Sequence, residues 1–329
     1  MLDLTTLPMR AAIGQFNELT DEQIAFALQC GVQDVLLNTP LLPGDERWEF
    51  KDLLKLRMRA EERGLRVICL ENVPIKFYDQ IMIGAEGRER QLVNMQETVR
   101  NMGRAGIPIL GYHWMPNSVW RTGWDTPVRG GATSNSFDLE LAKNAPLSHG
   151  RVYSDEEMWA TYDWYMERML PVCEEFGVRM ALHPDDPPVP SLGGVARLFR
   201  NFENFQRALD THDSPMHGLD FCHGCWSEMR GGAGVLDAIE HFGARGKIFY
   251  MHLRDVRGTA EHFTECFINE GNSNPFAVVR KLKAVGFNGF IIDDHVPHMV
   301  NDSPWGHRGR AFATGHISAL LDVVNTLDH

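Results

Sequence analysis

Four short apolar segments in the second half of the chain each end in side chains that can bind a metal ion. In order, these ends provide a histidine, a cysteine, a second histidine and an aspartate. Two imidazole nitrogens, a thiolate and a carboxylate suffice to hold a divalent transition metal while leaving coordination positions open for a substrate. The thiolate is compatible with zinc or iron. The four ends are His183–Pro188, Asp220–Gly224, Met251–Arg254 and Asp293–His295.

The direction of these side chains follows from the alternation along a strand. His252 shares a face with Ile248, and we expect it to point into the fold. Asp294 shares a face with Ile292, which favours Asp294 over Asp293 as the inward carboxylate. An isolated buried histidine or cysteine is most often a packing residue, but four such donors at corresponding strand ends favour one shared site.

The cysteines are expected to be reduced, because six in 329 residues are too few for a disulfide framework. Cys222 and Cys225 have the spacing of a redox pair or of half a zinc knuckle. However, no second Cys-rich half follows and no thioredoxin-like segment surrounds the pair. We therefore expect Cys225 to be structural.

The elements that must position these donors are strands and helices in regular alternation. Eight such units fit a closed (β/α)8 barrel, a TIM barrel of the α/β class, better than an open doubly wound sheet, whose nucleotide-binding form needs a glycine fingerprint after the first strand. We predict a single barrel domain over residues 1–329. The strands are expected at Met9–Phe16, Val32–Asn38, Leu65–Asn72, Ile107–His113, Val178–Pro184, His217–Gly224, Lys247–Arg254 and Gly289–His295, and the helices at Asp21–Gln29, Phe50–Arg63, Arg88–Arg104, Ser154–Phe176, Glu203–Thr211, Gly234–Phe242, Pro275–Val285 and Arg310–Leu327.

A long Pro/Gly/Ser-rich insertion at about 114–154 follows the fourth strand. It is too long for a simple connection, so we expect a lid over the site or an oligomer contact. Tryptophans at 114, 120 and 124 favour a contact with a second subunit, and we predict a homo-oligomer. Because the active site of such a barrel lies where the strands end, the four donors are expected to converge there.

The composition excludes two classes of partner. With 32 Lys+Arg against 44 Asp+Glu, the net charge of −12 repels nucleic acid and anionic membrane surfaces. No apolar run reaches the roughly 18 residues of a membrane span, and the first thirty residues carry no basic segment followed by an apolar one. We predict a cytoplasmic protein that acts on a small molecule.

The strand ends, taken in order, resemble those of the mannonate dehydratase family. The resemblance implies a TIM-barrel hydro-lyase of hexuronate catabolism that converts D-mannonate to 2-keto-3-deoxy-D-gluconate with Mn2+, Fe2+ or another divalent metal. It implies that His183, Cys222, His252 and Asp294 are the metal ligands, and that His295 is a catalytic acid or base. The residues that carry the resemblance are His183–Pro188, Phe221-Cys222, His252–Arg254 and Asp294-His295, together with Glu71–Ile75, Tyr112–Pro116 and Arg121-Thr122.

The chemistry of such a dehydration requires a base near the α-carbon, a cation near the carboxylate and a proton donor for the departing β-hydroxyl. His295 suits one of the two proton-transfer roles, and the sequence leaves open which one. The candidates for the other role are Tyr112, His113 and His307.

Several charged residues near the expected barrel mouth are candidates for substrate binding, each with a structural alternative. The arginines could bind the carboxylate or hydroxyls, or could form internal ion pairs. The paired aspartates could orient an imidazole or bind the sugar, or could serve the turn. The glutamate could reach the sugar, or could form a cap or a salt bridge. These candidates are Arg121, Arg197, Arg254, Asp185, Asp186 and Glu71.

Two other functions remain open for the same barrel. One is a sugar isomerase or epimerase resembling xylose isomerase, although such enzymes usually carry more carboxylate ligands. The other is a sugar-acid binding protein without catalysis. The chain also departs from the family pattern, with neutral amides in Gly271–Asn274 and no tyrosine in Pro304–Arg308. An amidohydrolase is disfavoured because Gln15-Phe16 stands where a His-x-His pair is needed.

Overall fold

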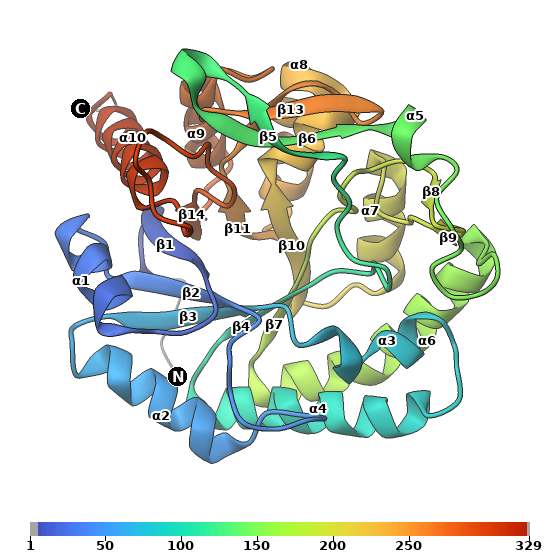
Figure 1. Cartoon of the computed structure of the whole chain (residues 1–329). Helices are drawn as coiled ribbons and strands as arrows, with labels where there is room; N and C mark the ends of the chain where they lie inside the picture. The colour runs from blue at the N-terminus through green and yellow to red at the C-terminus, as the bar shows by residue number, and fades with distance from the viewer. Residues whose placement is uncertain (1–5, 328–329) are drawn as a thin grey trace.

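The chain forms a closed barrel of eight parallel strands, which confirms the predicted TIM barrel (Figure 1). The computed structural model describes residues 6–327. Around the barrel the strands follow the order β1-β14-β11-β10-β7-β4-β3-β2, and β1 pairs with β2 to close it. They are β1 (Arg10–Phe16), β2 (Asp34–Asn38), β3 (Arg66–Glu71), β4 (Ile109–Tyr112), β7 (Arg179–Leu182), β10 (His217–Cys222), β11 (Ile248–His252) and β14 (Phe290–Ile292).

Helices surround the barrel, and their ends follow local sequence signals (Figure 1). Ser154 and Glu157 form a capping box at the start of α6, and Gly177 ends that helix with a φ of 67°. No helix within residues 6–327 is long and apolar enough to cross a membrane. The helices are α1 (Asp21–Gln29), α2 (Phe50–Glu61), α3 (Asp79–Met82), α4 (Arg88–Ala105), α5 (Leu139–Ala142), α6 (Asp155–Phe176), α7 (Phe202–Thr211), α8 (His223–Ala244), α9 (Pro275–Ala284) and α10 (His307–Thr326), with short 3-10 turns η2 (Ile75–Phe77) and η3 (Arg129–Gly131).

Helix α8 begins earlier than the sequence predicted. We expected it at Gly234–Phe242, but it starts at His223, directly after β10, and contains a break at Gly231, where φ is 65°. The glycine-rich segment 231–234 is therefore inside the helix. As a result, Cys222 is the N-cap residue of α8 and lies where the partial positive charge of a helix N-terminus is felt.

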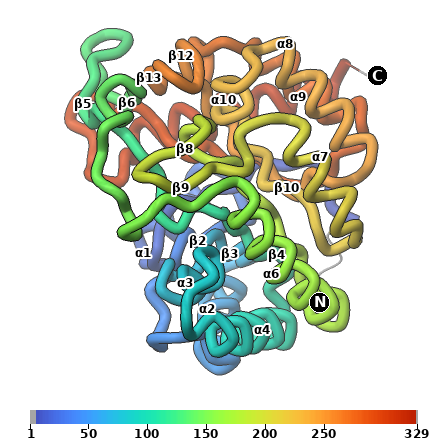
Figure 2. The backbone as a smooth tube through the Cα atoms, turned by 90° about the vertical axis from the view of Figure 1, so that its right-hand side faces the viewer, coloured from blue at the N-terminus to red at the C-terminus, as the bar shows by residue number. Residues whose placement is uncertain are grey.

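The insertion after β4 contributes two strands to a separate antiparallel sheet. This sheet has the order β12-β13-β6-β5, and its other two strands directly follow barrel strand β11. Figures 1 and 2 show the green insertion beside the orange β12–β13 hairpin. The insertion is thus joined to a segment far away in the sequence. The strands are β5 (Gly123–Pro127), β6 (Thr133–Asp138), β12 (Asp255–Thr259) and β13 (His262–Cys266); a short hairpin of β8 (Ser191–Leu192) and β9 (Val195–Ala196) forms a sheet of its own.

The interior of the barrel is packed rather than hollow. Alternate residues of β4 face it, so Ile109 joins the buried interior cluster with Phe290 and Ile292. Gly111 faces the same way, and its missing side chain leaves room for Tyr250: a Cβ built there would lie 2.3 Å from the Tyr250 hydroxyl. The next residue along β4 must therefore point outward.

We predict that Gly111→Ala destabilises the barrel. The added methyl group would meet the Tyr250 hydroxyl and Glu71, so the free energy of unfolding should fall by about 1–3 kcal/mol, as for other overpacked cores. Urea denaturation measures the change. Gly315→Ala in α10 is the matched control: nothing lies within 4 Å of its Cβ position, and helix propensity should make it neutral or stabilising by up to about 1 kcal/mol. Equal effects at both sites would contradict the packing argument.

Candidate active site

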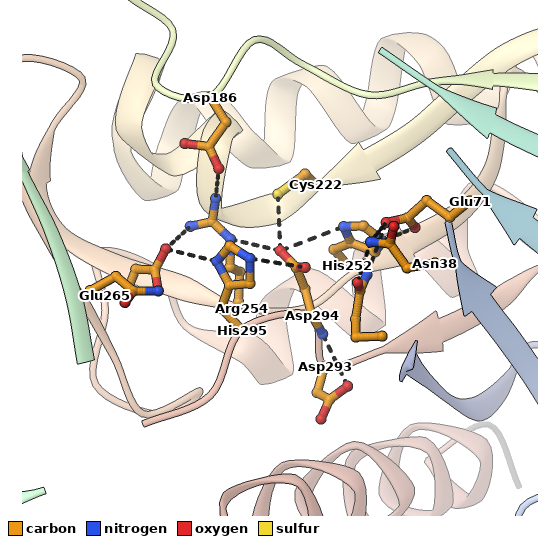
Figure 3. A network of polar contacts seen from close by, with 12 residues as sticks. Asn38, Glu71, Asp186, Cys222, His252, Arg254, Glu265, Asp293, Asp294 and His295 are labelled. Carbon is orange, nitrogen blue, oxygen red and sulfur yellow. Dashed lines mark hydrogen bonds and ion pairs between the residues drawn. The ribbon is translucent and has the colours of Figure 1, made fainter. Parts of the chain in front are cut away.

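Four potential metal donors meet at the carboxyl ends of neighbouring barrel strands. Donor atoms of His183, Cys222 and His252 all lie within 4.8 Å of one another. Asp294 Oδ2 lies 4.0 Å from Cys222 Sγ and 3.6 Å from His252 Nδ1 (Figure 3). The four residues come from the ends of β7, β10, β11 and β14, which are adjacent in the barrel. The structure therefore brings the predicted donors together.

Both imidazole rings are held so that one nitrogen is left for the cluster. His183 Nδ1 donates to the Pro184 carbonyl oxygen at 2.6 Å, and His252 Nε2 donates to Glu71 Oε2 at 2.7 Å. His252 Nδ1 is buried and has no hydrogen-bond partner among the described residues. A buried, unpaired nitrogen beside a carboxylate needs an explanation, and a bound cation supplies it. The site therefore fits a divalent metal.

Glu71 is hydrogen-bonded to His252, one of the four donors. Its Oε2 accepts hydrogen bonds from His252 and the Tyr250 hydroxyl, and its Oε1 accepts from Gln15 and Asn38. Burial by itself would raise the pKa of Glu71, but the charge and hydrogen bond of His252 lower it to about 2. All of its acceptor positions are used, so the geometry favours orientation of His252 over the predicted contact with the sugar.

Cys222 lies in surroundings that favour a thiolate. Burial would raise the pKa of its thiol, but a hydrogen bond with Cys225 and the positive charges of Arg254 and His183 lower it well below the usual value. A thiolate is the form of cysteine that binds metals. Cys225 itself accepts a hydrogen bond from Arg254 Nη2 at 3.3 Å, which agrees with the structural role expected for it.

Asp220 lies deeper in the barrel than the four donors and was not among the site residues predicted from the sequence. The residue is fully buried, and neither of its carboxylate oxygens has a hydrogen-bond partner among the described residues. Oδ1 lies 3.5 Å from His252 Nε2. Burial raises the pKa of Asp220 to about 8, against the opposing effect of His252 and His183. It therefore adds a titratable group directly beneath the cluster.

His295 lies between the cluster and a cavity. Its Nδ1 is 2.8 Å from Glu265 Oε1, and its Nε2 is 3.6 Å from Asp294 Oδ1 (Figure 3). Burial would lower the pKa of His295, but Asp294 and Glu265 raise it. Its side chain is 35% exposed, whereas Asp294 is 7% exposed. The cavity measures about 490 Å³ and is lined by Trp124, Asp125, Thr133, Ser134, Asn135, His295, Val296, His298, Pro304, Trp305 and Arg310.

Arginines and carboxylates form a buried chain of ion pairs beside the cluster. Arg121 binds both oxygens of Asp186, at 2.6 and 2.8 Å, and also Glu265 at 2.6 Å. Arg254 Nη2 lies 3.0 Å from Asp186, and its Nε lies 2.9 Å from Asp294. These side chains therefore bind one another, and the geometry favours the structural alternative for Arg121, Arg254 and Asp186.

A second group of possible metal ligands is already occupied by an internal cation. Donor atoms of Asp186, Cys225 and Glu228 lie within 4.8 Å of one another. However, the Arg254 guanidinium contacts all three, at 3.0, 3.3 and 3.2 Å. The positive charge that this acidic group requires is therefore supplied by the protein itself.

Asp185 and Arg197, two further candidates for substrate binding, make hydrogen bonds to neighbouring backbone segments. Asp185 Oδ2 accepts a hydrogen bond from the Phe199 backbone at 2.6 Å. Arg197 donates to the carbonyl oxygens of Asp186 and Ser118 at 3.1 and 2.8 Å. Both side chains are buried, and their contacts favour loop stabilisation over contact with a substrate.

The three candidates for the second proton-transfer role lie in different places. The Tyr112 hydroxyl is 3.0 Å from that of Tyr162 and 3.2 Å from His217 Nε2, outside the barrel against α6. His307 contacts Ser303 and Glu22 and does not line the cavity. Only His113 stays near the cluster, where burial and the positive charge of His183 lower its pKa to about 3. The structure does not bring Tyr112 or His307 to the site.

Backbone strain is concentrated at the same end of the barrel. Gln15, Thr39, Asn72 and Asp294 all lie within two residues of the end of a barrel strand and have φ values of 62°, 43°, 60° and 71°. Left-handed conformations cost free energy in residues other than glycine and persist where the surrounding structure enforces them, often at functional sites. At Asp294 this conformation accompanies a hydrogen bond from its backbone N–H to Asp293 Oδ1 at 3.0 Å.

Comparison with known proteins agrees with this geometry. A family model described as D-mannonate dehydratase (UxuA) matches residues 10–149 and 140–329. The chain belongs to the mannonate dehydratase family. Its relatives include the mannonate dehydratases of Thermotoga maritima, 28% identical over 90% of this chain and 92% of the relative, and of Streptococcus pneumoniae strain 70585, 28% identical over 89% and 87%.

Solved structures support both the family and the fold. The crystal structure of mannonate dehydratase from Streptococcus suis serotype 2 matches with a TM-score of 0.88 and 26% identity, covering 97% of this chain and 96% of that one. A D-tagatose 3-epimerase-like protein matches with a TM-score of 0.63 and 17% identity, covering 98% and 100%. A match at that identity shows the barrel fold alone. Family membership makes the chain a hydro-lyase by class.

We predict that Tyr112→Phe lowers stability without removing mannonate dehydratase turnover. Loss of the hydroxyl removes its hydrogen bonds with Tyr162 and His217, which keep their bond to each other at 3.1 Å, and this should cost about 1 kcal/mol of unfolding free energy. Urea denaturation and initial rates measure the two effects. Tyr153→Phe is the control, because no hydrogen bond of its hydroxyl is found among the described residues, and it should change stability by less than about 0.5 kcal/mol. A stable Tyr112→Phe protein with a hundredfold lower rate would restore the catalytic interpretation.

Proposed function

We propose that this chain is a metal-dependent dehydratase that converts D-mannonate to 2-keto-3-deoxy-D-gluconate and water. The proposal is supported by family membership over nearly the whole chain. The observation that carries it is the cluster of two imidazoles, a thiolate and a carboxylate, in which His252 Nδ1 is left unpaired, directly beside the partly exposed His295. A sugar acid is the substrate class that suits both the family and the polar cavity.

The residues that would hold the metal are His183, Cys222, His252 and Asp294. Mn2+ is the ion we propose, with Fe2+ or another divalent metal as alternatives. When bound, it would supply positive charge for the substrate carboxylate and for the charge that develops when the neighbouring C–H bond breaks. Since a thiolate and a carboxylate already offset the charge of a divalent ion, neutral imidazoles are suitable as the remaining two donors.

The reaction breaks the C2–H bond and the bond between C3 and its hydroxyl group. The C2 proton passes to a base, the electron pair forms a C2–C3 double bond, and the hydroxyl leaves as water after receiving a proton. The resulting enol becomes the 2-keto acid. We assign proton exchange to His295 Nε2, because that atom lies on the side of Asp294 while Nδ1 is bound to Glu265. The homo-oligomer and the cytoplasmic location stay predictions.

We predict that the protein, stripped of metal with a chelator and reloaded with Mn2+, converts D-mannonate to a 2-keto-3-deoxy acid. The thiobarbiturate or semicarbazide assay detects the product, and the stripped protein should be inactive. Fe2+ under anaerobic conditions, Mg2+ and Zn2+ identify the preferred ion. A panel of other aldonates tests the substrate.

Two outcomes of that experiment would contradict the dehydratase proposal. Incorporation of solvent deuterium into the sugar without loss of water would indicate an isomerase or epimerase. Saturable binding of the aldonate, with no product after prolonged incubation, would indicate a binding protein on the same barrel.

We predict that Cys222→Ala loses bound metal. Removal of the thiolate should lower the stoichiometry of tightly bound Mn2+ and reduce turnover by at least about a hundredfold. Elemental analysis after gel filtration measures the first effect and initial rates measure the second. Cys173→Ala is the matched control, because Cys173 is an equally buried thiol in α6 and should retain both metal and activity. Full metal occupancy in Cys222→Ala would exclude the proposed ligand set.

A further inference from the structure

We infer that Glu265 is a positioning residue for His295, and that the insertion after β4 holds Glu265 in place. The inference rests on the proposed function, because it concerns the histidine to which proton exchange is assigned. Glu265 lies on β13, outside the barrel, and none of the motifs in the sequence includes it. Its Oε1 atom nevertheless makes the shortest contact of His295, at 2.8 Å from Nδ1.

This contact determines which nitrogen of His295 carries the proton. A carboxylate only accepts hydrogen bonds, so Nδ1 must be the donor. Nε2 is then free to lose and to receive a proton, and it is the nitrogen on the side of Asp294. A neutral imidazole without such a partner can place its proton on either nitrogen. The bond to Glu265 therefore selects one tautomer and one ring orientation.

Glu265 is itself fixed by the insertion. Arg121 donates to Oε1 from Nε at 3.1 Å and from Nη2 at 2.6 Å, and Asn135 donates to Oε2 at 3.1 Å. Both donors belong to the segment between β4 and α6, whereas Glu265 follows barrel strand β11. Strand pairing joins the same two segments, with Thr264 opposite Ser136. The insertion thus positions His295 through Glu265, in addition to any role in covering the site.

A simpler role for Glu265 is to neutralise the buried Arg121. The two roles differ in what a change of geometry at constant charge would do. Glu265→Asp keeps the negative charge near Arg121 but withdraws the carboxylate from His295. Glu265→Gln keeps the shape but removes the charge. If Glu265 only neutralises Arg121, kcat should survive Glu265→Asp. If Glu265 positions His295, both substitutions should lower kcat.

The test measures the tautomer of His295 directly and then its kinetic consequence. Protein with 15N-labelled histidine and loaded with diamagnetic Zn2+ is examined by NMR without substrate, and the His295 signals are assigned by their loss in His295→Asn. The spectra are recorded at a pH where His295 is neutral, and there we expect the wild type to carry its proton on Nδ1 and Glu265→Gln to shift toward Nε2. With Mn2+ and D-mannonate, kcat should fall about 10²–10³-fold while KM changes less than about threefold.

Glu270→Gln is the matched control. Glu270 is also an ion-paired glutamate near the end of β13, 3.0 Å from Arg257 Nη2, but it does not contact His295. The kcat of the Glu270→Gln protein and its His295 NMR signals should equal those of the wild type. If Glu265→Gln does not fold, Glu265→Asp decides, with an expected loss in kcat of at least about tenfold.

Each result has a definite meaning. A folded Glu265→Gln protein with the wild-type tautomer would overturn the inference, and so would Glu265→Asp with the kcat of the wild type. Failure of the wild type to dehydrate D-mannonate would instead overturn the proposed function. That failure would leave the tautomer measurement valid, because the measurement uses no substrate.

Discussion

The site depends on one constraint, namely that every charge buried beneath the barrel mouth must have an opposite partner. An unpaired ion in such surroundings costs several kcal/mol, while a paired and hydrogen-bonded one is tolerated. The chain meets this requirement with a closed circuit of alternating charge. From His295 it runs through Glu265, Arg121, Asp186 and Arg254 to Asp294, which returns to His295 Nε2 at 3.6 Å.

This circuit explains why segments far apart in the sequence must fold together. Arg121 comes from the insertion, Glu265 from β13, and Asp186 from the loop after β7. Loss of any one member would leave its neighbours charged and buried, so the three segments stabilise one another. Because Asp294 belongs to both the circuit and the donor cluster, these contacts link the insertion to the proposed metal ligands as well as to His295.

The sequence was sufficient to predict the barrel and the side chains that gather at its carboxyl end, but not the partners of those side chains. Strand and helix periodicity predicted the eight units, and alternation correctly favoured Asp294 over Asp293, which turns toward Arg310. The same rule could have excluded Tyr112: Gly111 faces the interior, so its neighbour must face α6. No local signal could have found Glu265, because its function arises from contacts with residues about 130 and 144 positions away. The partners of Arg121 and Arg254 were hidden for the same reason.

The shared barrel fold leaves the reaction to be decided by a few side chains. Structures named as epimerases or xylose isomerase domain proteins have the same architecture at 11–17% identity. In this chain Cys222, His252 and Asp294 are buried and His183 is half-buried, whereas the His295 side chain is 35% exposed at the cavity. A metal at the donors and a proton carrier at the cavity would therefore reach different atoms of one substrate. Dehydration has this requirement, because the carboxylate of the substrate must be held while the two adjacent carbons lose a proton and a hydroxyl group.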